Sequence, residues 1–313
     1  MNREKLRKYA DFFNKQNKYY KEQLYADILF DCHTNQLSAL FKQLLSRNNV
    51  KKKLNHILFP KNIKKFCDYS FVLNDNIDIS HILNWCNLVI GEYTNEINSY
   101  LEIKQEFEKN LFAEEYENAF QYLDIIEKRF GISLWLIGKK MMLYEKISGL
   151  EKHIEYFTEI INDADEQYNR RHEEIIGEYE FNRFMAIFDL ESCYSESNTS
   201  ETTLQRRIET YTKNLKEKDI SFQKYFRFRY GVDRGDNIEE IAYAMMIDAQ
   251  LSLIDMYETY VIAEQLLLIN NDTVHDNEIR DHRLNNLKII KYNAPINILD
   301  SEKFISSSSC PFP

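Results

Sequence analysis

The residue types and spacing best suited to chemistry occur near the end of the chain, in NDTVHDNEIRDHRLNN at 271–286. His275, Glu278 and His282 are separated by three and four residues, which would place them on one face of a helix. Two imidazoles and a carboxylate could bind a divalent metal or transfer protons. The same residues also suit the polar start of an ordinary helix, where the dipole favours acidic side chains. Because the sequence offers no second half of such a site, we expect no bound metal.

A second candidate is the arginine-rich stretch RFRYGVDRGD at 227–236. Arg227, Arg229 and Arg234 could bind a phosphate or carboxylate through bidentate guanidinium contacts, with neighbouring aromatic rings stacking on bases. The alternative is a helix that ends at a glycine, where cations interact favourably with the last carbonyls. Both interpretations remain open from the sequence.

A third candidate is the basic segment 47–65, which carries lysines close to Phe59 and Phe66. These are Lys51, Lys52, Lys53, Lys61, Lys64 and Lys65. Lysine-rich segments contact nucleic-acid backbones without reading sequence, but they are also ordinary solubilising surface. Residues 1–65 hold 15 Lys/Arg and 5 Asp/Glu, whereas the remainder holds 25 and 45. The basic part could therefore bind nucleic acid, an acidic protein surface or the acidic rest of the chain.

Familiar catalytic sequence patterns are missing. The sequence has no phosphate-binding GxxxxGK[ST], no GxGxxG, no HExxH and no GxSxG. Its five cysteines are scattered without a CxxC pair, as expected for reduced thiols. We expect a non-enzymatic protein without a cofactor, and an enzyme with an unfamiliar site at His275, Glu278 and His282 remains an alternative.

The elements that would position these residues are predicted to be helices. The chain is 44% hydrophobic but contains only 7 glycines and 4 prolines, with no proline between Lys61 and Ala294. A chain so poor in turn residues favours an all-α fold. We expect a basic helical region at 1–79, helical hairpins at 80–191, a polar linker or loop at 192–203, further helices at 204–300 and a flexible tail at 301–313.

The middle region repeats itself at an interval of 34 residues. EEYENAFQYLDIIEK (114–128) aligns with SGLEKHIEYFTEIIN (148–162), so that Tyr122 meets Tyr156 and Ile126 meets Ile160. Over about residues 98–165 the pattern resembles tetratricopeptide repeats, which have this period. The small residue that the family has early in its second helix is present as Ala119 and replaced by His153.

The resemblance implies helical hairpins stacked as a tetratricopeptide-like α-solenoid, whose concave surface usually binds another protein. Residues expected to pack the hairpins are Tyr116, Ala119, Leu123, Trp135, Met141, Leu150 and Phe157.

These observations lead to two functional hypotheses. The first is a protein-binding scaffold or adaptor subunit. The second is a nucleic-acid-associated subunit of a bacterial multi-gene system, such as phage defence, that uses the basic region. Because there is no apolar signal segment at the start and no long uncharged apolar run, we expect a cytoplasmic protein without a membrane span.

Overall fold

The computed structural model describes residues 34–46, 48–63, 79–171, 178–214, 220–230 and 238–270. These residues form α-helices and contain no strand, so the predicted all-α fold is confirmed for them. The helices, in chain order, are α3 (Thr34–Leu45), α4 (Asn48–Leu58), α6 (Ile79–Glu92), α7 (Thr94–Phe112), α8 (Tyr116–Phe130), α9 (Leu134–Ser148), α10 (Leu150–Arg171), α11 (Glu178–Ser195), α12 (Glu201–Asn214), α13 (Ile220–Tyr230), α14 (Ile238–Leu251) and α15 (Leu253–Asn270).

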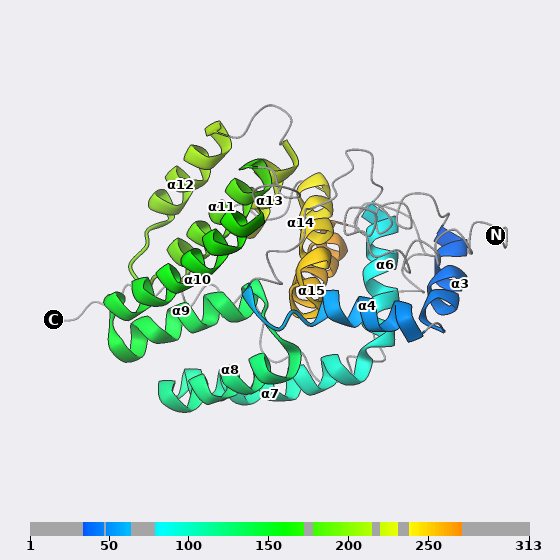
Figure 1. Ribbon diagram of the computed structural model, residues 1–313, viewed down its shortest axis with the longest axis horizontal. Coiled ribbons are helices and arrows are strands. Elements are labelled where there is room, and N and C mark those ends of the chain that lie inside the picture. Colours follow the sequence, from blue (N-terminus) through cyan, green and yellow to red (C-terminus); the bar gives the residue numbers. More distant parts are fainter. Residues whose placement is uncertain are drawn as a thin grey trace. The chain divides into compact units, whose positions relative to one another are not determined.

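Helices α7 to α10 form two successive antiparallel hairpins (Figure 1). Local chemistry sets their ends. Gly131 and Gly149 follow α8 and α9 with φ of 85° and 89°, a conformation that glycine adopts without strain. Ser133 then caps α9, because its hydroxyl accepts a hydrogen bond from the Leu136 amide at 3.0 Å.

Apolar faces hold these hairpins together. Ala119, Leu123 and Ile126 of α8 are fully buried, as are Met141 and Leu143 of α9. Each helix from α7 to α10 packs against its neighbours in sequence, an arrangement that is compatible with a helical repeat.

Helices α14 and α15 occupy the centre of the described structure, between α6 and the group formed by α11 and α13 (Figure 1). Residues 241–251 of α14 are all buried, and all but Asp248 and Gln250 are apolar. Helix α15 packs against α6 and α9, which are distant in sequence, so the chain folds back on its own middle region. The sequence predicts one long helix over 237–270; the structure divides it at Ser252.

The polar stretch at 192–203 is partly helical. Helix α11 continues to Ser195, with Ser192 and Cys193 buried, and α12 begins at Glu201. Two of its residues contact other helices: Ser192 lies against His153 of α10, and the Ser197 amide donates a hydrogen bond to Glu145 of α9. The helices on both sides belong to one compact unit that runs to Asn270.

No helix in the described part of the chain has the length and hydrophobicity needed to cross a membrane. The residues predicted at 1–33, the tail at 301–313 and the set His275, Glu278 and His282 lie outside the described residues.

Candidate functional site

The described part of the basic segment lies on α4 and in the loop that follows it. Lys51, Lys52 and Lys61 are exposed. Lys51 forms an ion pair with Glu92 of α6 at 2.9 Å, so its charge is partly neutralised within the chain. The Lys53 side chain and residues Lys64 and Lys65 are outside the described part.

Lys52 and Lys61 line a cavity of about 550 Å³ that also receives residues of α7 and α8. The charged residues of its lining are Lys52, Lys61, Arg129 and Glu96, and the apolar part consists of Phe59 and Phe130, with Asn55 and His56 beside them. We call this the basic cavity. Arg129 comes from α8, nearly 70 residues further along the chain, and was not among the residues expected to bind an anion.

The close approach of two loops positions this cavity. The Ile132 amide donates a hydrogen bond to the Pro60 carbonyl at 2.7 Å, which ties the loop after α4 to the loop after α8. A Cβ atom on Gly131 would lie 2.1 Å from the same carbonyl oxygen, so only glycine fits there. The contact holds Lys61 and Arg129 at one site.

Further contacts fix the wall formed by α4. The Tyr93 hydroxyl donates to Asn55 Oδ1 at 2.5 Å, and the Phe59 and Tyr93 rings meet edge-on with centroids 5.7 Å apart. The Arg129 guanidinium lies over the Phe130 ring at 5.6 Å. The cavity therefore has a packed aromatic base and a cationic rim.

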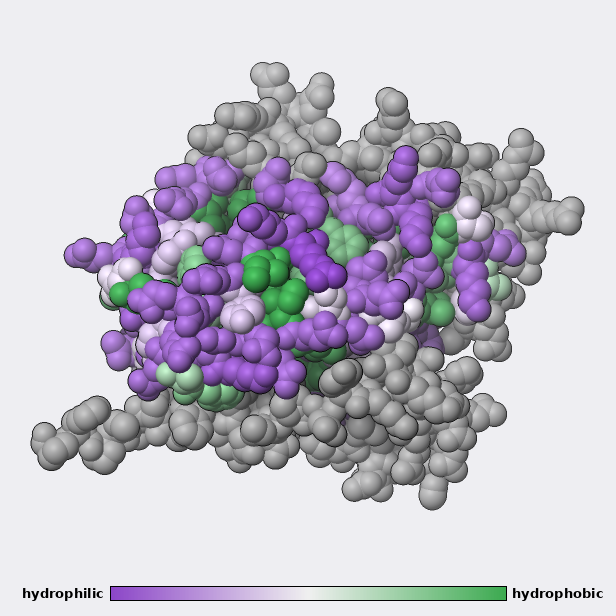
Figure 2. All heavy atoms as spheres, turned by 90° about the horizontal axis from the view of Figure 1, so that it is seen from below, coloured by the Kyte–Doolittle hydropathy of each residue, from purple (hydrophilic) through white to green (hydrophobic). Residues whose placement is uncertain are grey.

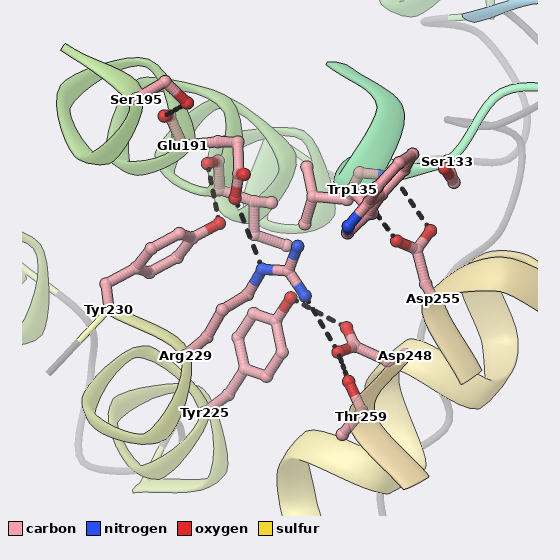
Figure 3. A network of polar contacts seen from close by, with 12 residues as sticks. Ser133, Trp135, Glu191, Ser195, Tyr225, Arg229, Tyr230, Asp248, Asp255 and Thr259 are labelled. Atoms are coloured by element: carbon pink, nitrogen blue, oxygen red, sulfur yellow. Dashed lines mark hydrogen bonds and ion pairs between the residues drawn. The ribbon is translucent and has the colours of Figure 1, made fainter. Parts of the chain in front are cut away.

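The arginine-rich stretch reaches a different part of the molecule. Arg229, in the last turn of α13, contacts Glu191 Oε2 of α11 at 3.3 Å and Asp248 Oδ2 of α14 at 3.0 Å (Figure 3). Asp248 also accepts hydrogen bonds from the hydroxyls of Tyr225 and Thr259. One guanidinium thus bridges two buried carboxylates from different helices.

Of the other two arginines, Arg227 is exposed and Arg234 lies outside the described residues. Anion binding by the three arginines stays a prediction, although Arg229 is engaged by carboxylates of the chain itself. The position of Glu191 also explains a glycine inside α9. A Cβ atom on Gly138 would lie 2.2 Å from Glu191 Oε1.

Asp255 of α15 connects the same centre to the hairpins (Figure 3). Its two carboxylate oxygens accept hydrogen bonds from the amides of Leu134 at 2.9 Å and Trp135 at 3.0 Å, so it caps α9 from another helix. Burial raises the pKa of Asp255 to about 7; Arg229 opposes this rise and Asp248 adds to it. Asp255, Arg229 and their partners form what we call the polar network, which fastens α9, α11, α13, α14 and α15 together.

The residues expected to pack the hairpins differ in exposure. Ala119, Leu123 and Met141 are buried, Tyr116, Trp135 and Phe157 are half-buried, and Leu150 is 48% exposed. The Trp135 ring meets the rings of Tyr100 and Phe107 edge-on, with centroids 5.5 and 5.8 Å apart.

Large apolar side chains are exposed at the turn ends of both hairpins. Phe112, at the end of α7, is 65% exposed, and Leu150 and Ile154, at the start of α10, are 48% and 50% exposed. Figure 1 places the α7–α8 and α9–α10 turns on the same side of the molecule. Seen from the side of α7 and α8, the surface is mainly hydrophilic with small separate apolar patches (Figure 2).

His153 and Ser192 form a polar pair between α10 and α11. His153 Nε2 lies 2.8 Å from Ser192 Oγ, and Nδ1 lies 4.0 Å from Glu145 Oε2. Serine, imidazole and carboxylate occur in this order in serine hydrolases. Here Ser192 is only 6% exposed and His153 is fully buried, so the arrangement presents no accessible nucleophile and fits a buried contact between helices.

Within the described ranges, no group of three or more His, Cys, Asp or Glu residues could hold a metal ion. Comparisons of the chain with protein-family models, with curated proteins and with solved structures give no match.

Proposed function

We propose that this chain is a non-enzymatic scaffold that binds another protein through the turn ends of two tetratricopeptide-like hairpins. The observation that carries this proposal is the exposure of Phe112, Leu150 and Ile154 at those ends. Single exposed apolar residues are common, whereas exposed apolar residues that lie together mark interaction sites.

The fold holds these three residues at fixed positions. Helices α8 and α9 pack on each other, so the turns of the two hairpins keep their spacing without a partner. A rigid apolar site loses little conformational entropy on binding, and a large aromatic side chain such as Phe112 is a frequent anchor of protein interfaces. The partner would present an apolar surface of its own.

Affinity capture with the tagged full chain tests the proposal. We expect wild-type protein to retain one partner at stoichiometric amounts, and Phe112→Asp and Ile154→Asp to lose it. Ile238→Asp is the matched control, because Ile238 is 50% exposed on α14, away from the hairpin turns. Circular dichroism should show that all three variants remain folded.

Two outcomes would contradict the scaffold proposal. One is recovery of the chain alone from cells that express it at its native level. The other is retention of the partner by both hairpin variants.

A second candidate function is association with nucleic acid, supported by the convergence of Lys52, Lys61 and Arg129 on the basic cavity. Binding of labelled DNA and RNA across a salt series tests it. We expect affinity to fall steeply as salt rises, because phosphate contacts release bound counterions. Absence of binding at low ionic strength would exclude this function.

A further inference from the structure

We propose that the basic cavity binds the phosphate monoester of a nucleotide, either free or at the 5′ end of a nucleic acid. The proposal extends the second candidate function, on which it rests for the class of ligand. It adds a defined site, a charge requirement and a residue, Arg129, that the basic segment does not contain.

The charge of the cavity suits a dianion. Lys52, Lys61 and Arg129 contribute three positive charges and Glu96 contributes one negative charge. In the described part of the chain, no carboxylate forms an ion pair with any of the three cations. The surplus of two positive charges matches a phosphate monoester, which carries about −1.5 to −2 at pH 7, better than a diester with a single charge.

The three cations come from separate elements, so the site depends on the tertiary structure. Lys52 lies on α4, Lys61 in the following loop and Arg129 on α8. A planar guanidinium and two ammonium groups around one cavity can contact different oxygens of one phosphate. Long charged side chains spread along a single exposed helix would not provide this convergence.

Size and lining suit the organic part of a nucleotide. The cavity is an open depression of about 550 Å³, large enough to admit a nucleotide. Phe59 is half-buried in its wall and packs edge-on against Tyr93, which fixes an apolar surface next to the cations. A nucleobase or ribose can lie against such a surface while the phosphate faces the cationic rim.

The walls are already fixed by contacts within the chain. The Ile132–Pro60 hydrogen bond and the Tyr93–Asn55 hydrogen bond hold the two sides of the cavity in place. These contacts fix the backbone that carries the three exposed cations, so less of the chain has to be ordered on binding.

Titration calorimetry of the full chain with AMP tests the site. We expect Arg129→Ala to weaken AMP binding by about tenfold or more, as for loss of a charged hydrogen bond. Lys128→Ala is the matched control, since Lys128 is an exposed cation on the same helix outside the cavity lining, and we expect less than a twofold change. Glu96→Gln should tighten binding, because it removes the only carboxylate of the described lining.

Two comparisons identify the source of the phosphate. Adenosine should not bind, because it lacks the phosphate. A 5′-phosphorylated oligothymidylate that binds more tightly than its 5′-hydroxyl form, with the difference abolished in Arg129→Ala, would assign the site to nucleic-acid ends. AMP binding without this difference would assign it to free nucleotides.

The proposal is overturned if AMP does not bind, or if Arg129→Ala and Lys128→Ala reduce binding equally. In either case, salt-dependent binding of 5′-hydroxyl oligonucleotides would leave the second candidate function standing without this site.

Discussion

The hairpins α7–α10 and the central group formed by α11, α13, α14 and α15 are both packed helical assemblies, but they differ in the interactions that predominate between their helices. Between α8 and α9 most buried contacts come from apolar side chains such as Ala119, Leu123 and Met141. The buried Lys140 of α9 adds ion pairs with Asp124 and Glu127 of α8, which are more exposed. In the central group Arg229 bridges Glu191 and Asp248 inside the protein. Apolar packing tolerates approximate complementarity, whereas buried charges require every partner to be present. The stability of the first region should therefore depend mainly on the volume of its side chains, and that of the second mainly on their charge.

The largest expected effect is on the central group. Arg229→Ala leaves the buried carboxylates of Glu191 and Asp248 without their cation, and should lower the free energy of unfolding by about 3–5 kcal/mol. Urea denaturation measures this change. Arg206→Ala, on the exposed surface of α12, is the control and should change stability by no more than about 0.5 kcal/mol. An equal, small effect of both variants would show that the network contributes no stability.

The hairpins should respond to added volume. Ala119→Trp inserts a large ring where Ala119 is fully buried, and should destabilise the protein by about 1–3 kcal/mol or more through overpacking. Ala113→Trp, at an exposed position at the end of α7, serves as control and should have little effect. Thermal unfolding followed by circular dichroism compares the two. Wild-type stability of Ala119→Trp would mean that the α8 face is not closely packed.

The two regions should also differ in the sign of their pH dependence. Burial raises the pKa of Asp255 from 3.8 to about 7, so folding favours its protonated form. Its contribution to stability is complete below about pH 4 and is lost as pH rises through about 7. In wild-type protein this loss gives the free energy of unfolding a slope of up to about 1.4 kcal/mol per pH unit. Asp255→Asn should make that slope smaller. Urea unfolding at pH 5 and pH 8 measures the slope, and an unchanged slope would assign it to other groups.

His153 should give a pH dependence of stability opposite in sign to that of Asp255, and this is the smallest of the expected effects. Burial lowers its pKa from 6.5, against the raising influence of Glu196 and Glu145, so folding favours neutral imidazole. The contribution of His153 to the free energy of unfolding is complete above pH 6.5 and is lost as pH falls through the lowered pKa. His153→Gln should reduce the loss of stability between pH 7 and pH 5 and keep a polar contact with Ser192. Steeper acid destabilisation in this variant than in wild type would contradict the assignment.

Helical periodicity predicts the hairpins well because their contacts are local. The glycines after α8 and α9 and the cap at Ser133 are local signals for element ends. Contacts from distant residues add to them, because Gly131 lies against Pro60 and Asp255 of α15 also caps α9. The division at Ser252 and the continuation of α11 to Ser195 were not predicted, because both depend on what the residues face after folding. Polar composition suggests a linker or loop at 192–203; within this stretch Ser192 is buried and contacts His153.

The candidate sites, too, depend on contacts that the sequence pattern does not reveal. Lysine density points to α4, but the basic cavity needs Arg129 from α8 and the approach of Pro60 to Gly131. Arg229 stands out as a cation in the sequence, but its carboxylate partners lie 19 and 38 residues away along the chain. No spacing rule for a single helix connects these residues.

The sequence by itself determined the helical class, since its scarcity of glycine and proline and its apolar periodicity act through neighbouring residues. The glycines after α8 and α9 also indicate where these two helices end. Only the tertiary structure decided which charges are neutralised in the interior and which converge on a cavity. Electrostatic interactions depend on distance and burial after folding, and the order of residues along the chain specifies neither.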